Sequence, residues 1–266
     1  MNVLEKEREL KDLIKGYGSA VVAFSGGIDS SLVASIASEV LGDETVAVTA
    51  KSPVYPSWDE EDARKVSEET GIRHIFLDTQ ELEDENFVEN PEDRCYYCKR
   101  GLLERLDEIR KKLGCEKILD GTNSSDFEDY RPGLRAVREF GGIVKSPLAE
   151  AQLKKEDVRK IAENRGLPNA DKPSSPCLAS RIPFGDRITS EKIERIESAE
   201  EYLRSLGFRI VRVRDHGKIA RLEVAKKKIP NLLKRGGKIK ERLKDLGYDY
   251  VSVDLKGYRT GSLNPK

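Results

Sequence analysis

Ala20-Val-Val-Ala-Phe-Ser-Gly-Gly-Ile-Asp-Ser-Ser-Leu32 is the stretch that decides the fold of this chain. Its apolar start, Val21 to Phe24, has the β-branched and aromatic composition of a buried strand in a parallel sheet. Ser25-Gly-Gly27 follows as a sharp turn, and apolar residues then recur at helical spacing until Gly42 ends the helix. A helix N-terminus offers unpaired backbone N–H groups and the positive end of a dipole, and glycines let an anion approach the backbone closely. The stretch therefore predicts a phosphate-binding turn between a strand and a helix.

The polar side chains of this turn are consistent with a nucleotide site. Ser25 and Ser30 can donate hydroxyl hydrogen bonds, and Asp29 can cap the helix or orient a metal ion. The turn lacks the Gly-Lys-Ser/Thr ending of a Walker loop. Its sequence, Ser25-Gly-Gly-Ile-Asp-Ser30, instead resembles the pyrophosphate-loop (PP-loop) signature of enzymes that cleave ATP between its α and β phosphates to adenylate a substrate. The alternative is an ordinary strand, turn and helix with a capping aspartate.

The composition carries no signal for nucleic acid or membrane binding. The 266 residues suit one large or two ordinary domains, and a hydrophobic content of 37% is enough to build their cores. The formal net charge is zero, so no overall field attracts polyanions or acidic lipid surfaces. Charged residues make up 36% of the chain, which is compatible with heat adaptation. Because the sequence shows neither a signal peptide nor an apolar stretch of about twenty residues, we expect a cytoplasmic location.

Alternating strand and helix patterns predict an α/β fold with a doubly wound parallel sheet over residues 1–180. Polar turns follow two of the predicted strands. Ala50-Lys-Ser-Pro53 follows the strand from Thr45 to Thr49, and Asp120-Gly-Thr-Asn-Ser-Ser-Asp126 follows a later, shorter strand. Ligands of open α/β sheets bind at the carboxyl ends of the strands, so both turns are expected near the nucleotide. Glu81 to Pro91 is predicted to be an acidic, mobile connection.

The last third of the chain predicts a second, smaller domain. Residues 169–187 contain three prolines and no sustained helical period, which indicates an ordered loop between two domains. Beyond this loop, Arg209 to Asp215 and Ile219 to Val224 predict a β-hairpin, with helices before and after it. We therefore expect residues 181–266 to form an α+β domain that serves substrate binding or oligomerisation.

Three of the four cysteines form a candidate metal set. Cys95 and Cys98 lie three residues apart at the predicted start of a helix, and Cys177 lies in the interdomain loop. Three thiolates can hold zinc with one open position, or three irons of a [4Fe–4S] cluster with a fourth iron left to bind hydrosulfide. The alternative is a structural zinc ion that ties the loop to the first domain. Cys115 is interpreted as a small apolar residue.

Arginines of the second domain form a candidate anion site. Arg212 and Arg214 alternate along a predicted strand, so their side chains point to the same face. With Arg181 and Arg259 nearby, they suit a phosphate or a carboxylate. The alternative is a solvated strand face paired with carboxylates. The basic run from Lys226 to Lys244 is interpreted as a solvated helix face rather than an RNA contact, because aromatic residues are sparse there.

Taken together, these motifs make nearly the whole chain similar to the LarE family, the ATP-dependent pyridinium-carboxylate sulfur transferases of nickel-pincer cofactor synthesis. The turn at residues 25–30 identifies only the PP-loop superfamily, and the segment around Cys177 is the more specific sign. The motifs that carry the resemblance are Ser25-Gly-Gly-Ile-Asp-Ser30, Asp120-Gly-Thr-Asn123, Arg131-Pro-Gly133, Ser175-Pro-Cys-Leu-Ala-Ser-Arg181 and Arg212-Val-Arg-Asp-His216.

The resemblance implies ATP, Mg²⁺ and a pyridinium mononucleotide whose carboxylate is adenylated before sulfur replaces an oxygen. It also implies a homo-oligomer. The phosphate of the substrate nucleotide is expected on Arg212, Arg214 and Arg259, with Arg181 nearby, and the cysteine that matches Cys177 can surrender its own sulfur and become dehydroalanine. The residues expected at ATP are Ser25, Gly26, Gly27, Asp29, Ser30, Lys51, Gly121, Thr122 and Arg131.

This chain departs from the single-cysteine version of the family because it also carries Cys95 and Cys98. It therefore resembles the variety in which a three-cysteine [4Fe–4S] cluster carries an extra sulfide to the activated substrate, with sulfide or another sulfur donor as a further reactant. Two other functions stay open at this point. One is a tRNA thiolase that uses the same ATP and cluster chemistry on a base, and the other is a non-catalytic ATP- or AMP-sensing module with a zinc clip.

Overall fold

The computed structural model describes residues 2–128, 130–173, 175–259 and 261–263, which divide into two compact units. The sequence predicts one boundary after residue 180, whereas the second unit begins five residues earlier and also takes two short segments from the N-terminal half. The first unit consists of Met1–Ser52, Ser57–Gln80 and Cys95–Ser175, and the second of Pro53–Pro56, Glu81–Arg94 and Pro176–Lys266.

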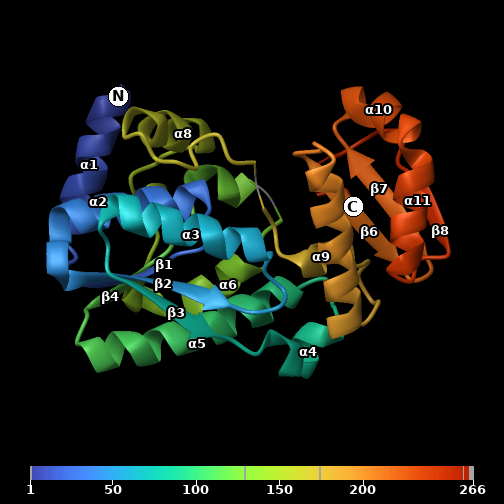
Figure 1. The fold of residues 1–266 in the computed structure, drawn as a ribbon. Coiled ribbons are helices and arrows are strands. Elements are labelled where there is room, and N and C mark those ends of the chain that lie inside the picture. The colour runs from blue at the N-terminus through green and yellow to red at the C-terminus, as the bar shows by residue number, and fades with distance from the viewer. Residues whose placement is uncertain (1, 129, 174, 260, 264–266) are drawn as a thin grey trace. The chain divides into compact units, whose positions relative to one another are not determined.

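The first unit is built on a parallel sheet, as the sequence predicts (Figure 1), and its strand order is β3-β2-β1-β4-β5. The central strand β1 pairs with β2 on one side and with β4 on the other. The order of strands along the chain therefore reverses between β1 and β4, which is the switch point where ligands of such sheets bind. The strands are β1 (Ala20–Ala23), β2 (Thr45–Lys51), β3 (His74–Asp78), β4 (Lys117–Leu119) and β5 (Val144–Lys145).

Helices cover both faces of this sheet, and none of the described helices is long and apolar enough to cross a lipid bilayer. The longer ones are α1 (Val3–Lys15), α2 (Ile28–Leu41), α3 (Ser57–Thr70), α5 (Arg94–Leu113), α6 (Gly133–Glu139) and α8 (Lys155–Asn164). The shorter elements are the helix α7 (Pro147–Glu150) and the 3₁₀ turns η1 (Gly42–Glu44), η3 (Ser124–Glu128) and η4 (Gly141–Ile143).

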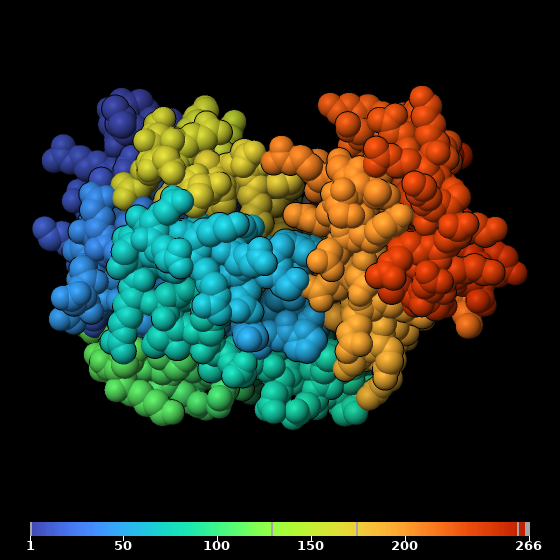
Figure 2. Space-filling model, viewed as in Figure 1, coloured from blue at the N-terminus to red at the C-terminus, as the bar shows by residue number. Residues whose placement is uncertain are grey.

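Strand β1 is apolar on both faces because each face contributes to a separate core. Val22 and Phe24 pack with α1, α2, α3 and α8, whereas Val21 packs with α5 and α6 on the other side. Figure 2 shows the outer surfaces of two of these helices, α3 in cyan and α5 in green along the lower edge of the unit. A strand buried on both faces needs an unbroken apolar run, which is the pattern found from Val21 to Phe24.

The second unit is a small α+β fold around a three-stranded sheet with the order β6-β7-β8. Strands β6 (Val211–His216) and β7 (Ile219–Val224) form the predicted antiparallel hairpin, and β8 (Tyr250–Val253) pairs parallel to β7. One apolar core joins the sheet to its helices. The other elements are η2 (Glu81–Glu83), α4 (Glu85–Val88), η5 (Leu178–Arg181), α9 (Ser190–Ser205), η6 (Lys226–Lys228), α10 (Ile229–Lys234) and α11 (Gly236–Asp245).

The acidic segment after β3 differs from its prediction as a mobile connection. It contains η2 and α4, and the side chain of Asn90 within it is fully buried. Asn90 Nδ2 donates to the carbonyls of Pro183, at 2.6 Å, and Asp186, at 2.8 Å. Further contacts tie the segment to its unit: the carbonyl of Val88 accepts the N–H of Ile188 at 2.8 Å, and Arg187 pairs with two glutamates of the segment. The prediction missed this order because all of these partners lie roughly a hundred positions further along the chain.

Gly26 determines how closely the turn after β1 approaches α3. Its φ is +66°, a left-handed conformation that glycine adopts without strain. A Cβ added here would lie 2.6 Å from the carbonyl oxygen of Asp59 and 2.9 Å from the backbone nitrogen of Ala63. Any side chain at this position would push the turn away from α3.

We expect Gly26→Ala to lower the free energy of unfolding by about 2–4 kcal/mol, because overpacking adds to the backbone strain. Gly42→Ala is the matched control, since Gly42 also has a positive φ, +54°, but nothing lies within 4 Å of an added Cβ. Urea denaturation of both variants measures the two losses. Equal losses would contradict the packing argument.

Candidate functional site

The turn after β1 is held in shape by its own serines. Ser30 Oγ accepts the N–H of Ser25 at 3.1 Å and donates to the carbonyl of Gly27 at 3.0 Å. The N–H of Gly27 points to Ser25 Oγ at 3.4 Å, and Gly27 is the N-cap of α2. Ser30 is buried, whereas Ser25 is exposed. The turn thus presents backbone N–H groups and hydroxyls at the positive end of a 14-residue helix, an arrangement that binds phosphate.

The loop after β4 closes against this turn at the switch point. A Cβ added at Gly121 would lie 2.8 Å from the backbone nitrogen of Ser30, so glycine is required for the two loops to meet. Asn123 Nδ2 donates to Asp29 Oδ1 at 3.2 Å. The structure therefore brings together the two sequence motifs expected at the phosphates of ATP.

Lys155 is a functional candidate that sequence reasoning missed. Its ammonium group contacts Asp29 Oδ2 from the first residue of α8, 126 residues further along the chain. A signal was present, because a lysine in the first turn of a helix is unfavourable next to the helix dipole unless an anion lies nearby. Asp29 is that anion, and its carboxylate is now held by Lys155 and Asn123.

Asp120 is an ionised carboxylate buried at the end of β4. It accepts hydrogen bonds from the backbone and the hydroxyl of Thr122 and from Ser146 Oγ at 2.7 Å, and Lys99 Nζ lies 3.2 Å away. Burial acts to raise the pKa of Asp120, but the charge of Lys99 and these hydrogen bonds outweigh it, so the pKa lies below its ordinary value. The side chain of Thr122 is thus turned toward Asp120, and Lys99 links the loop to α5 directly after Cys98.

The other two residues expected at ATP lie on the same unit. Lys51 is the exposed last residue of β2, the neighbour of β1. Arg131 is half-exposed and pairs with Asp126 at 2.7 Å, and that carboxylate also accepts the N–H of Asn123 at 3.0 Å. Arg131 is therefore connected to the loop after β4, while direct contact of either residue with ATP stays a prediction.

The cysteines of the proposed cluster come from both units. Cys95 is exposed and Cys98 half-buried, and they lie one helical turn apart at the start of α5 in the first unit. Cys177 is half-buried and precedes η5 in the second unit. Among the residues that the structure describes, no group of three or more His, Cys, Asp or Glu side chains is arranged to hold a metal ion. The three-cysteine cluster therefore stays a prediction.

Arg181 holds the backbone of Cys177 in the second unit. Its side chain is 0% exposed and forms a bidentate pair with Glu200, with both N···O distances 2.8 Å. Burial disfavours the charge of Glu200, but Arg181 outweighs it and lowers the pKa of that carboxyl. Arg181 Nη1 also donates to the carbonyls of Pro176, at 2.6 Å, and Cys177, at 3.0 Å. The structure thus shows Arg181 in contact with Glu200 and with the backbone of residues 176 and 177. Its contact with a substrate phosphate stays a prediction.

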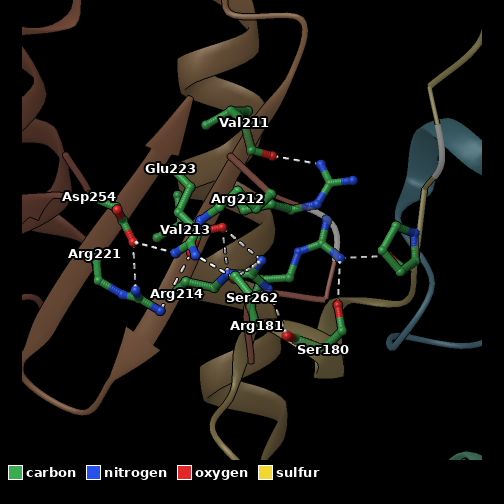
Figure 3. A network of polar contacts seen from close by, with 12 residues as sticks. Ser180, Arg181, Val211, Arg212, Val213, Arg214, Arg221, Glu223, Asp254 and Ser262 are labelled. Atoms are coloured by element: carbon green, nitrogen blue, oxygen red, sulfur yellow. Dashed lines mark hydrogen bonds and ion pairs between the residues drawn. The ribbon is translucent and has the colours of Figure 1, made fainter. Parts of the chain in front are cut away.

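Arg212 and Arg214 lie on β6, and their side chains belong to the same polar network as Arg181 (Figure 3). Arg214 pairs with the buried Glu223 at 2.8 Å. Burial, reinforced by the positive charge of Arg181, lowers the pKa of Arg212 to about 10. A bound anion would offset the loss of solvation that burial imposes on the charge of Arg212.

Arg259 is placed differently from the other predicted arginines. It is half-exposed and lies 3.6 Å from Asp254, a carboxylate that Arg221 also contacts, at 2.8 Å. A phosphate contact for Arg259 therefore requires it to give up this long ion pair, and Asp254 would then keep Arg221 as its partner.

Comparison with known proteins agrees with this geometry. The family model described as NAD synthase matches residues 4–93. The chain is 43% identical to an uncharacterised protein of Synechocystis sp., with 97% of both chains covered. It is 39% identical to the pyridinium-3,5-bisthiocarboxylic acid mononucleotide synthase of Lactiplantibacillus plantarum, over 97% of this chain and 94% of the relative. It is also 29% identical to a component of the glutamine-hydrolysing GMP synthase of Pyrococcus horikoshii, over 78% of this chain and 71% of the relative.

These similarities assign the chain to a family. The matched region of the NAD synthase model contains the turn after β1, and the similarity to the synthase of L. plantarum extends through both units. The resemblance found in the sequence is thereby confirmed. The chain belongs to the LarE family of PP-loop, ATP-dependent sulfurtransferases.

Proposed function

We propose that this chain uses ATP to adenylate a carboxylate of a pyridinium mononucleotide and then replaces a carboxylate oxygen by sulfur. The observation that carries the proposal is the meeting of two glycine turns, at Gly26 and Gly121, at the switch point of a parallel sheet. The relative in L. plantarum is named for a pyridinium-3,5-bisthiocarboxylic acid mononucleotide. That name supports the corresponding pyridinium carboxylate as the substrate class here.

Activation must come before sulfur transfer, because a carboxylate oxygen is a poor leaving group. A substrate carboxylate oxygen attacks the α phosphorus of ATP, the bond to the bridging oxygen breaks, and pyrophosphate leaves with that electron pair. The N–H of Gly27, the hydroxyl of Ser25 and the N-terminus of α2 stabilise the charge on the leaving pyrophosphate. Lys51 and Arg131 are proposed to contact the same nucleotide.

The carboxylate of Asp29 suits the Mg²⁺ ion that accompanies ATP in PP-loop enzymes. Its oxygens are donors of the type that Mg²⁺ prefers, and the side chain is half-buried beside the phosphate turn. Mg²⁺ supplies charge neutralisation at the phosphates when bound. Lys155 and Asn123 fix the carboxylate of Asp29 in this position.

We place the phosphate of the substrate nucleotide at Arg212, Arg214 and Arg259. A phosphate dianion beside Arg212 would stabilise a guanidinium whose pKa is lowered by burial and by Arg181. Arg214 is held rigidly by Glu223, so it can contribute a directed donor with little loss of side-chain entropy.

AMP is a better leaving group than a carboxylate oxygen, so the acyl carbon of the adenylate accepts a sulfur nucleophile and releases AMP. We propose Cys95, Cys98 and Cys177 as ligands of a [4Fe–4S] cluster, which when bound supplies hydrosulfide at its remaining iron. The thiols of Cys95 and Cys98, one turn apart on α5, fit this group in donor type and spacing. The alternatives are sacrifice of the sulfur of Cys177 and a structural zinc ion on the same thiols.

We expect Ser30→Ala to lower kcat/KM for pyrophosphate release by about 10- to 100-fold, because the variant loses the hydroxyl that shapes the phosphate turn. Ser38→Ala is the matched control on the same helix, where the hydroxyl donates to the carbonyl of Thr70 at 3.3 Å, away from the turn. A coupled assay of pyrophosphate release with ATP and a pyridinium dicarboxylate mononucleotide measures both variants.

The same assay separates the competing functions. Wild-type protein that releases no pyrophosphate with the pyridinium substrate contradicts the proposal. Release with unmodified tRNA instead, together with salt-dependent tRNA binding, would favour a tRNA thiolase. ATP binding with no pyrophosphate release on any carboxylate would favour a nucleotide-sensing module.

We expect Cys95→Ala to abolish the iron that wild-type protein retains after anaerobic reconstitution, and to restrict the protein to at most one turnover of sulfur transfer. Cys115→Ala is the matched control, since Cys115 lies after the C-terminal end of α5 and outside the proposed ligand set. Iron content, visible absorption and product per protein chain measure the effect. Multiple turnover by Cys95→Ala, or reconstituted wild-type protein that holds zinc but no iron, would overturn the cluster proposal.

A further inference from the structure

The carbonyl of Gly26 is held from the side of the turn that faces the protein interior. It accepts hydrogen bonds from Asn169 Nδ2 at 2.9 Å and from Lys172 Nζ at 3.4 Å. The same amide nitrogen of Asn169 also donates to Ser31 Oγ at 2.8 Å. Both donors lie in the segment between α8 and Cys177, which none of the roles described so far involves.

The direction of this carbonyl sets the direction of the next N–H. The peptide group between Gly26 and Gly27 is planar and trans, so its C=O and its N–H point in opposite directions. With the carbonyl directed at Asn169, the N–H of Gly27 faces the Ser25 hydroxyl, 3.4 Å away, on the exposed side of the turn. In the proposed function, a phosphate of ATP approaches from that side.

A turn made of two glycines needs such a restraint. Without a Cβ on either residue, rotation of the intervening peptide meets little steric resistance. The rotated peptide would present its carbonyl oxygen to a phosphate, and two partial negative charges would then face each other. Within the turn, the Ser25 hydroxyl restrains only the N–H side of this peptide, through a long contact of 3.4 Å, so its carbonyl side depends on groups outside the turn.

Asn169 and Lys172 are themselves held rigidly. Asn169 is 5% exposed, and among the described contacts its Oδ1 has no hydrogen-bond partner. The hydrogen bonds from its Nδ2 to Gly26 and Ser31 therefore set the orientation of the amide. Lys172 Nζ is fixed by Asp59 at 2.8 Å and Asp62 at 2.7 Å on α3. Arg159 of α8 donates to the carbonyls of residues 170 and 172, at 3.2 and 3.4 Å.

We propose that Asn169 and Lys172 are positioning residues for the phosphate turn: they hold the Gly26 carbonyl so that the Gly27 N–H is directed at a phosphate of ATP. This inference rests on the proposed function, in which residues 25–30 bind those phosphates. Neither side chain touches the phosphate, and both act through one peptide group.

The test is Asn169→Asp, which keeps the shape of the side chain but replaces the donating amide by an acceptor. At pH 8 we expect its affinity for ATP to fall about tenfold relative to wild type, the loss of one directed hydrogen bond. As the pH is lowered to 5.5, protonation of the new carboxyl provides an O–H that can donate to Gly26, so the ratio to wild type should return toward one. Burial and the Gly26 carbonyl oxygen raise the pKa of such a carboxyl, whereas the Lys172 ammonium on the same carbonyl acts to lower it.

Adenosine distinguishes positioning from a general structural effect. Asn169→Asp should bind adenosine like wild type at both pH values, because adenosine has no phosphate for the Gly27 N–H to contact. Asn169→Ala should lose ATP affinity without recovery at low pH. Asn164→Asp, at the exposed end of α8, is the matched control and should follow wild type throughout.

Calorimetric titration with ATP and with adenosine measures these affinities. Wild-type affinity of Asn169→Asp for ATP at pH 8, or an equal loss of affinity for ATP and adenosine, would overturn the positioning role while leaving the proposed function intact. Failure of the wild-type protein to bind ATP would overturn the proposed function together with this inference.

Discussion

The close approach of backbone to backbone at the switch point of the sheet is the constraint on which the first unit depends. Gly26 lies so near α3, and Gly121 so near Ser30, that a single methyl group at either position would collide with main-chain atoms. This proximity places the N-terminus of α2, the loop after β4 and the Asp29 carboxylate around one small region. Without this close approach, the two glycine turns would not meet at the switch point of the sheet.

Charges around the turn are fixed by pairing before any ligand binds. Asp29 is held by Lys155, Asp120 by Lys99, and Lys172 by two carboxylates of α3. Such pairs cost desolvation free energy, and their value lies in keeping donors and acceptors in one geometry. The site therefore requires little reorganisation when a highly charged nucleotide arrives, which is what electrostatic stabilisation of a leaving group demands.

In the second unit, arginines are likewise fixed by pairing with carboxylates. Buried Glu200 forms a bidentate pair with Arg181, and one oxygen of buried Glu223 accepts two hydrogen bonds from Arg214 while its other oxygen lies 3.5 Å from Arg221. Arg181 then uses its remaining donors to fix the backbone of Cys177, so the conformation of the proposed sulfur-handling residue depends on a buried ion pair. On the first unit, Lys99 connects the helix that carries Cys95 and Cys98 to the loop after β4. Both cysteine segments are thus attached to structured polar networks.

Much of the fold and part of the site were predictable from the sequence. The apolar run from Val21 to Phe24, the glycine turn and the later strand patterns predicted the parallel sheet, because a strand buried on both faces has a distinctive composition. The hairpin around Gly217 was predictable for a similar local reason. The segment from Glu81 to Pro91 was not, since its order comes from contacts of Asn90, Val88 and two glutamates with residues roughly a hundred positions further along the chain.

The sequence by itself determined the glycine turn between a strand and a helix, the family and the arginine pair on one strand, because each of these depends on residues close together in the chain. Only the tertiary structure decided which distant side chains serve the turn: Lys155 on Asp29, and Asn169 and Lys172 on the Gly26 carbonyl. The physical reason is that a hydrogen bond or ion pair is selected by distance in space. No local pattern records which lysine or asparagine, far along the chain, folding will bring within hydrogen-bonding distance of a given oxygen.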